Sequence, residues 1–274
     1  MKFIKNLFYL LLSISILTSC GSSENEDNMD PTTLPSTDDN DDDDTTSGDG
    51  DGSATTVIPD VYKKIYGATD MYIDGDMIVI EMEGIPDHNS PYYENTSWAS
   101  ERYEAYNSQD FRKNPNVIAS VDRTVRMPLN PEEASNHQET QLGTMGIALN
   151  GVAFYNQYAG PNNQALTDEI FSFDQYNGHP QNVGVYHYHL EPTYLTSQDT
   201  VGRDGLLGFL LDGFPVYGPM ENGSAVSNND LDDYHGHSHV TSDYPDGIYH
   251  YHITSEDPYI NGNGYYGTPG TSTE

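Results

Sequence analysis

Apolar residues along this chain fall in short runs bounded by Gly, Pro, Asn and Asp, a pattern typical of β-strands. Runs at 71–73 and 77–82 flank the dipeptide Asp74-Gly75, which favours a tight hairpin turn. A further strand, broken by Asn150-Gly151, is predicted within 146–155, and others are predicted at 185–190, 208–211 and 248–253.

Long helices are not predicted. No extended stretch repeats apolar residues at the helical period of 3.6 residues, and Pro and Gly recur throughout the chain. Pro131, followed by Glu132 and Glu133, suits the start of a short helix. We therefore predict a mainly β fold, either β-sandwich-like or irregular, with short helices in long loops.

The amino-terminal residues have the pattern of a bacterial export signal. Lys2 and Lys5 precede an apolar stretch at 7–17, which is shorter than the roughly 20 residues that span a bilayer. The sequence LTSCG at 17–21 then resembles a lipobox, so we predict a signal peptide at 1–19 and attachment of acyl chains, palmitate among them, at Cys20. The alternative is a secretory peptide with an unrelated cysteine.

Residues 20–56 are rich in Ser, Thr, Asn, Asp, Glu, Gly and Pro, and we predict a lipidated, acidic, disordered tether. Asp49-Gly50-Asp51-Gly52 matches a calcium loop poorly and is interpreted as linker. One folded domain is predicted at 57–274. We expect a lipid-anchored protein of the cell envelope, at the outer membrane, and both surface exposure and a periplasmic position stay open.

Composition restricts the partners. The formal net charge is -33, which disfavours nucleic acid and leaves cations, extracellular small molecules or glycans. Cys20 is the single cysteine, so no disulfide can form within the chain. The 22 tyrosines against 8 phenylalanines suit half-exposed strands or a polar cleft.

The main candidate for chemistry is a repeated motif. GVYHYHL at 184–190 recurs as GIYHYHI at 247–253. Because residues two apart on a strand share a face, the histidines of each copy project together and could bind a transition metal, with copper and zinc as the candidates. The predicted ligands are His187, His189, His250 and His252. The alternative is that these histidines make structural hydrogen bonds.

Other residues near the two copies are secondary candidates. His179, His88 and His237 are added to the candidate ligands, and His235, His237 and His239 form an alternating group that suits either an accessory metal site or a polar loop. Asp212 follows an apolar strand in a turn rich in Gly and Pro. Its carboxylate is a candidate catalytic base or metal ligand, and the alternative is a role in capping the turn.

With these motifs the chain resembles the YHYH domain family. The resemblance rests on both motif copies and on GIPDH at 84–88, ALNGV at 148–152, GHP at 178–180, LDGFPVYGP at 211–219 and LD at 231–232. It implies an exported protein but supplies no reaction. Cysteines that often lie near these motifs in the family are absent here, so any family disulfide is absent too.

Three functions fit these observations. The first is a metal-binding domain for capture or sensing. The second is a metal-dependent extracellular hydrolase or oxidase. The third is a carbohydrate- or protein-binding surface module that would not need metal. The Gly-x-Ser-x-Gly and His-Glu-x-x-His motifs of common hydrolases are absent, so whether the protein is an enzyme stays open.

Overall fold

A computed structural model describes residues 57–262 and 264–273. The predicted signal peptide at 1–19, the predicted lipidation of Cys20 and the predicted tether to residue 56 lie outside the described residues. Within the described part of the chain, no helix combines the length and the apolar character needed to cross a membrane.

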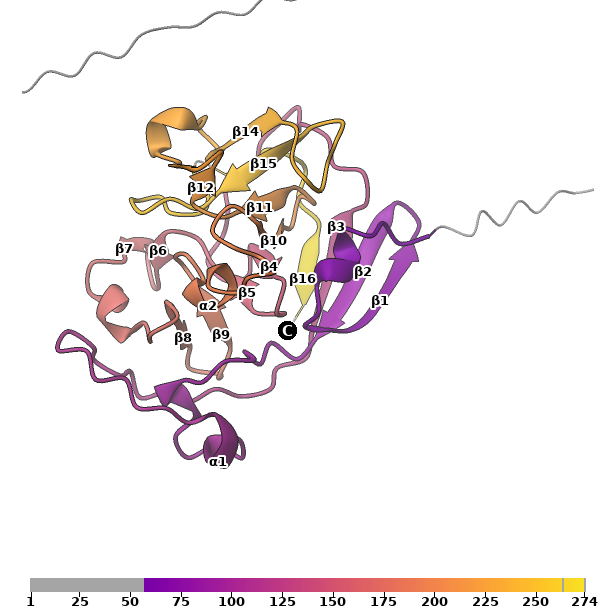
Figure 1. The fold of residues 1–274 in the computed structure, drawn as a ribbon. Helices are drawn as coiled ribbons and strands as arrows, with labels where there is room; N and C mark the ends of the chain where they lie inside the picture. The colour runs from indigo at the N-terminus through magenta and orange to yellow at the C-terminus, as the bar shows by residue number, and fades with distance from the viewer. Residues whose placement is uncertain (1–56, 263, 274) are drawn as a thin grey trace, which may run out of the picture. The chain divides into compact units, whose positions relative to one another are not determined.

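A small antiparallel sheet lies along one side of the described domain (Figure 1). Its strand order is β1-β2-β3-β16, with β1 (Ala68–Asp74), β2 (Met77–Met82), β3 (Arg123–Pro128) and β16 (Thr271–Thr273). Asp74 pairs with Met77 across a tight turn in which Gly75 has a φ of 66°. The hairpin predicted at Asp74-Gly75 is therefore confirmed.

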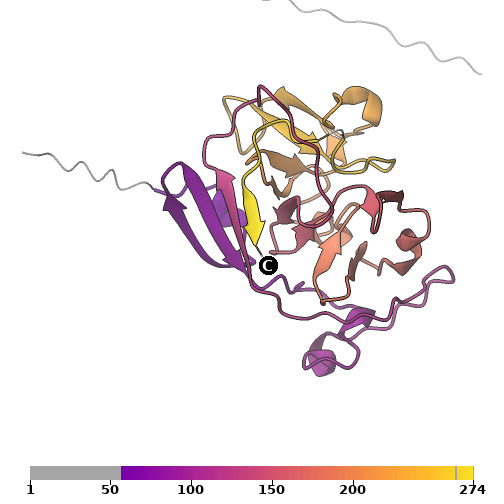
Figure 2. The same cartoon turned by 180° about the vertical axis from the view of Figure 1, so that it is seen from behind.

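A larger sheet of eight strands forms the centre of the domain. Its order is β14 (Gly236–His239), β15 (Ile248–His252), β11 (Pro215–Tyr217), β10 (Leu206–Leu210), β4 (Gly146–Ala148), β5 (Ala153–Phe154), β9 (Tyr186–Tyr188) and β8 (Gly178–Pro180). The strands of this sheet are short, and all except the edge strand β14 are almost completely buried. Seen from behind, the long segment that carries α1 (Ala99–Arg102) runs past the β8–β9 end of the molecule (Figure 2).

The large sheet consists of two equivalent halves. β4 and β10 form a central antiparallel pair in which Ile147 lies opposite Phe209. On one side β5 and β9 run in parallel, and on the other side β11 and β15 do the same. The sequence ALNGVAFY at 148–155 corresponds to LLDGFPVY at 210–217. A pseudo-two-fold axis through the central pair therefore relates the halves.

The central pair leaves no room for side chains at its equivalent glycines. A Cβ at Gly208 would lie 2.0 Å from the carbonyl oxygen of Ile147, and one at Gly146 would lie 2.4 Å from that of Phe209. Real Cβ atoms do not approach a carbonyl so closely, so glycine at both positions permits the close pairing of the halves.

The remaining elements are short. Two hairpins, β6 (Tyr158–Ala159) with β7 (Gln164–Ala165) and β12 (Met220–Glu221) with β13 (Ser224–Ala225), occupy equivalent places in the halves. The other helices are α2 (Thr193–Thr196) and the 3-10 turns Tyr62–Lys64, Pro91–Tyr93, Glu169–Ser172 and Asn228–Asp230. The predicted mainly β fold with short helices in long loops is confirmed.

One local prediction is wrong. Residues 131–133 do not start a helix. Glu133 instead forms an isolated antiparallel bridge with Gly267, because the carboxyl-terminal segment packs beside it. Tertiary pairing thus overrides the local helix-start signal.

Candidate metal centres

The two Tyr-His-Tyr-His copies lie along β9 and β15, which occupy equivalent places in the two halves of the sheet. Four strands, β5, β4, β10 and β11, separate β9 from β15. With about 4.8 Å between neighbouring strands, the copies lie roughly 24 Å apart along the sheet. They therefore belong to two centres rather than one, a question that the sequence had left open.

Each copy is joined by a histidine from the neighbouring strand. His179 on β8 pairs with His187, and His237 on β14 pairs with His250. Residues directly paired across two strands project to the same face. The secondary candidates His179 and His237 therefore complete an equivalent trio of imidazoles in each half.

The tyrosines of the motif take the opposite face and hold the strands in place. The hydroxyl groups of Tyr186 and Tyr249 donate to Asp174 and Asp232, each at 2.9 Å. Each aspartate also accepts the main-chain amides two and four residues further on. These aspartates begin a second repeat, Asp-x-Tyr-x-Gly-His, which the sequence analysis missed and which would have identified the paired histidines as equivalent.

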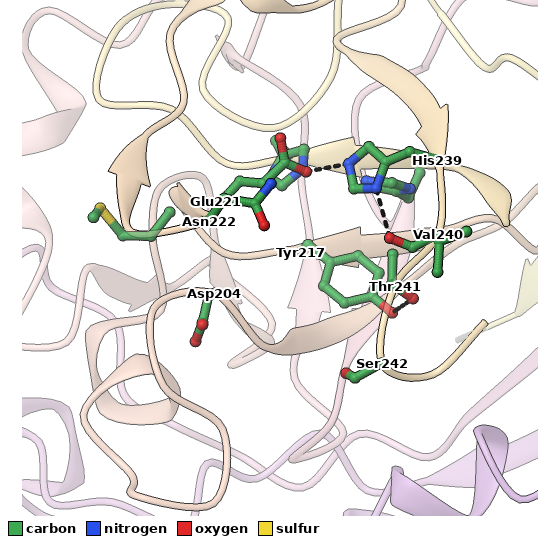
Figure 3. A pocket seen from close by; sticks show the side chains of 11 residues that line it. Asp204, Tyr217, Glu221, Asn222, His239, Val240, Thr241 and Ser242 are labelled. Atoms are coloured by element: carbon green, nitrogen blue, oxygen red, sulfur yellow. Dashed lines mark hydrogen bonds and ion pairs between the residues drawn. The ribbon is translucent and has the colours of Figure 1, made fainter. Parts of the chain in front are cut away.

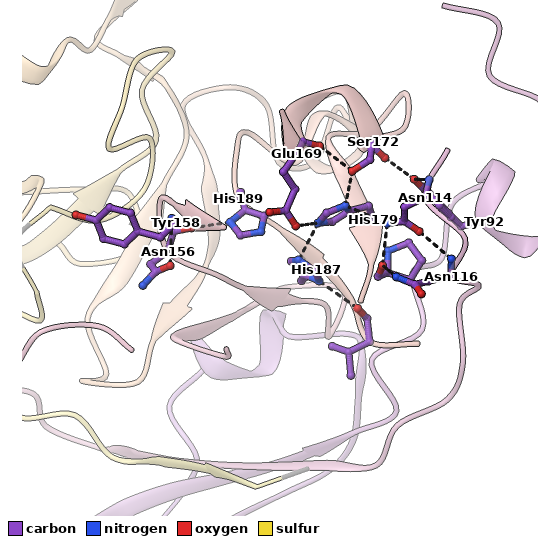
Figure 4. A network of polar contacts seen from close by, with 12 residues as sticks. Tyr92, Asn114, Asn116, Asn156, Tyr158, Glu169, Ser172, His179, His187 and His189 are labelled. Carbon is purple, nitrogen blue, oxygen red and sulfur yellow. Dashed lines mark hydrogen bonds and ion pairs between the residues drawn. The ribbon is translucent and has the colours of Figure 1, made fainter. Parts of the chain in front are cut away.

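Centre A comprises Glu169, His179, His187 and His189 (Figure 4), whose donor atoms all lie within 4.8 Å of one another. The Nε2 atom of His179 lies 3.0 Å from Nε2 of His187 and 3.2 Å from Oε1 of Glu169. All three imidazoles are buried, and the glutamate is half-buried. One carboxylate and three imidazoles thus converge on one point.

The Nδ1 atom of each imidazole in centre A, which points away from the centre, is hydrogen-bonded to an oxygen. The Nδ1 atoms of His187 and His189 donate to main-chain carbonyls at 3.1 and 2.5 Å. The Nδ1 atom of His179 donates to the Ser172 hydroxyl at 2.7 Å, because that hydroxyl donates its own proton to the Glu169 carbonyl. With the proton on Nδ1, each Nε2 lone pair faces the centre, as metal-ligating histidines require.

Burial sets the charge of these groups. It lowers the pKa of His189 to about 4, and burial with the neighbouring His179 and His189 lowers the pKa of His187 well below its usual value. Burial raises the pKa of Glu169, but the contact with His179 and the nearby imidazoles of His179 and His189 together outweigh burial, and the pKa is lowered. Near neutral pH these groups are thus neutral imidazoles and a carboxylate, the forms that bind metal.

Centre B, in the other half, comprises Glu221 from β12, His237 and His239 from β14, and His250 and His252 from β15. Nε2 of His237 lies 3.0 Å from Nε2 of His239 and 3.5 Å from Oε1 of Glu221. The carboxylate of Glu221 also contacts His239 (Figure 3). All five donor atoms again lie within 4.8 Å of one another.

Two nitrogens of centre B are buried without a hydrogen-bond partner among the described residues. Nδ1 of His250 and Nδ1 of His252 donate to main-chain carbonyls at 3.0 and 2.8 Å, so their Nε2 atoms carry the lone pairs. Neither Nε2 has a hydrogen-bond partner among the described residues. Burial lowers the pKa of His250 to about 3 and also lowers the pKa of His252. Neutral, unpartnered lone pairs that point into a carboxylate-lined centre fit a cation.

Three other candidates lie outside both centres. The ring nitrogens of His88 bond the Tyr188 hydroxyl at 3.1 Å and a main-chain carbonyl at 3.0 Å. Nε2 of His235 bonds the Thr254 hydroxyl at 3.0 Å. Asp212 is completely buried and accepts the Tyr251 hydroxyl at 2.5 Å on the tyrosine side of β15.

Neither carboxylate of the two centres was among the residues predicted from the sequence. Glu169 lies in the 3-10 turn Glu169–Ser172, and Glu221 lies in the β12–β13 hairpin. They occupy different places in the two halves, because the β12 position equivalent to Glu221 is Ala159 in the β6–β7 hairpin. Neither glutamate shares a motif with the histidines, so no spacing in the sequence indicates them.

Comparison with family models finds the YHYH protein family, matched over residues 124–229 and 220–264. The matched residues contain every candidate ligand of centres A and B. The resemblance inferred from the motifs is thereby confirmed. No curated protein and no solved structure matches the chain.

Proposed function

The chain belongs to the YHYH protein family, and we propose that it binds two transition-metal ions, one in centre A and one in centre B. The observation that carries the proposal is the orientation of the imidazoles. Hydrogen bonds from Nδ1 fix the tautomer, and the Nε2 lone pairs converge with a glutamate oxygen in each centre. Such outer hydrogen bonds orient metal-ligating histidines.

The donor chemistry favours copper or zinc. Imidazole suits zinc, copper, iron and nickel, whereas calcium and magnesium prefer oxygen donors. Three or four imidazoles with a single carboxylate therefore disfavour the alkaline-earth ions. We propose capture or sensing of such a metal as the function of the domain.

We expect metal analysis to find two ions per chain. The full chain, produced without a histidine tag, would be stripped with a chelator, dialysed against zinc or copper and analysed by mass spectrometry of the elements. The double variant His187→Ala/His189→Ala should retain one ion, and His250→Ala/His252→Ala should also retain one. Each variant removes buried Nε2 donors from one centre and leaves the other centre, on the far flank of the sheet, intact.

His137→Ala provides the matched control, because His137 stacks on Tyr234 outside both centres and its loss should leave two ions bound. A wild-type chain that binds no transition metal would overturn the proposed function. Loss of both ions in each double variant, with circular dichroism unchanged, would contradict independent centres.

We also propose that the protein is exported and anchored in the cell envelope through Cys20, at the outer membrane. The support is the order of charge, apolar stretch and LTSCG at 17–21. We expect Cys20→Ser to move most of the protein from the membrane fraction to the soluble fraction and to abolish labelling by radioactive palmitate. Unchanged fractionation and labelling would contradict the anchor.

A further inference from the structure

The two centres share a histidine trio but differ at one equivalent position. On β14, His239 lies two residues beyond His237 and pairs with Ile248. In the other half, Gln181 lies two residues beyond His179, and its main-chain N–H donates to the carbonyl of Val185. The place that holds a fourth imidazole in centre B therefore holds an uncharged amide in centre A.

This difference changes the number of free coordination positions. Centre B offers five donors and centre A offers four. A five-coordinate metal would thus have one position open at centre A, whereas the five donors of centre B would fill the same shell. Open positions distinguish sites that bind exogenous ligands from closed sites.

The cavity next to centre A is also larger than the cavity next to centre B. A cavity of about 710 Å³ opens onto His179, His187, His189 and Glu169 of centre A. The cavity at centre B has a volume of about 230 Å³. Pockets for small molecules fall roughly between 300 and 1,000 Å³, so the cavity at centre A has the size for such a ligand and the cavity at centre B is below it.

The lining of the larger cavity indicates the class of ligand. Uncharged amides line it, from Asn114, Asn116, Gln181 and Asn182, and Tyr155 and Tyr158 add aromatic rings. Apart from the tyrosines, its ionisable side chains are the four candidate metal ligands, and no Lys or Arg is among the lining residues. Away from the metal, a charged group of a ligand would lose its hydration without gaining a counter-charge, whereas hydroxyl groups can bond the amides and C–H faces can pack on the rings.

We propose that centre A, and not centre B, binds a neutral polyhydroxylated molecule of the saccharide class, with an oxygen of that molecule at the open metal position. This inference rests on the proposed binding of two metal ions. Centre B in this arrangement is a closed site that holds the β12–β13 hairpin against β14 and β15.

The open position can be tested with azide on the full chain loaded with Cu²⁺. Titration followed by visible absorption and electron paramagnetic resonance should detect one azide per chain. His187→Ala/His189→Ala should abolish this signal, and His250→Ala/His252→Ala should retain it. Two bound copper ions with azide at centre B, at both centres or at neither would overturn the inference and leave the proposed function standing, whereas absence of bound copper would overturn the proposed function itself.

A reciprocal exchange sharpens the test. Gln181→His should add a fifth donor to centre A and abolish azide binding there, while two copper ions remain bound. His239→Gln should open centre B and raise the stoichiometry to two azides per chain. Azide binding that neither exchange alters, with both copper ions present, would overturn the role assigned to this position.

The ligand class is tested by competition against azide at centre A. Glucose should displace azide, and charged analogues of glucose that carry a quaternary ammonium or a sulfonate group, both poor ligands of copper, should displace it less at the same concentration. His250→Ala/His252→Ala, which lacks centre B, should give the same order of displacement. Failure of glucose to compete, or stronger competition by either charged analogue, would overturn the assignment to neutral polyhydroxylated ligands.

Discussion

Saturating both centres with zinc or copper should raise the midpoint of thermal unfolding by about 5–11 °C per centre. A ligand at 100 times its dissociation constant stabilises the folded state by about 2.7 kcal/mol, and about 1 kcal/mol moves the midpoint of a domain of this size by roughly 2–4 °C. The domain has no cysteine after Cys20, so no disulfide within the chain cross-links its loops. Each metal would join the sheet to a peripheral element, the Glu169–Ser172 turn at centre A and the β12–β13 hairpin at centre B.

The two increments should be separable. The centres share no ligand, and free-energy changes at distant independent sites add. Scanning calorimetry of His187→Ala/His189→Ala should therefore show one increment on adding metal, and so should the equivalent pair His250→Ala/His252→Ala. His137→Ala should show both. Equal midpoints for stripped and loaded wild-type protein would contradict stabilisation by metal.

Much of the fold and two ligands of each centre could be predicted from local pattern. The hairpin at Asp74-Gly75 has a turn dipeptide that allows a positive φ, and the structure has that turn. The alternation in each Tyr-His-Tyr-His copy places two imidazoles on one face, because side chains on a strand alternate regardless of the surrounding fold.

The pairing of strands could not be predicted in the same way. β5 pairs with β9 across more than thirty residues, and parallel pairs of this kind depend on long connections. The sequence therefore left open whether the two copies form one centre or two. The correspondence of ALNGVAFY at 148–155 with LLDGFPVY at 210–217 is present in the sequence, and as a repeat it indicates two equivalent halves.

The carboxylates show the limit of motif reasoning. Glu169 and Glu221 reach their centres from a turn and a hairpin that occupy different places in the two halves. Their position depends on how those loops fold back over the sheet, a tertiary property with no local period. The cavity over centre A is set in the same way by loops from several parts of the chain.

Exchanging Asp212 with its counterpart Asn150 should reveal a buried charge that destabilises the fold at neutral pH. The two residues occupy equivalent positions, and their side chains bond Tyr251 and Tyr188, respectively. Asp212 is completely buried, and burial raises its pKa from 3.8 to about 6. A pKa raised in the folded state means that the folded protein holds the proton more tightly than the unfolded chain.

This difference in proton binding determines how the free energy of unfolding changes with pH. Between about pH 4 and pH 7 the folded state binds more protons at Asp212, so this group's contribution to the free energy of unfolding falls as the pH rises. The difference between 3.8 and about 6 corresponds to about 3 kcal/mol. Asp212→Asn removes the titrating group, and the free energy of unfolding of this variant relative to wild type should therefore increase by about 2.4 kcal/mol from pH 4 to pH 7, most of the full difference. Urea unfolding of chelated protein at both pH values measures this difference, because the other groups cancel between the two chains.

Asn150→Asp is the reciprocal variant and should show the opposite sign. The Asn150 amide donates to the carboxylate of Asp87 at 3.1 Å, so an aspartate there would lose that bond and place two carboxylates side by side. Its stability relative to wild type should fall as the pH rises from 4 to 7. A relative stability of Asp212→Asn that does not change with pH would show that Asp212 is ionised in the folded protein without penalty, with the donors from Tyr251 and the Gly267 amide offsetting its burial in full.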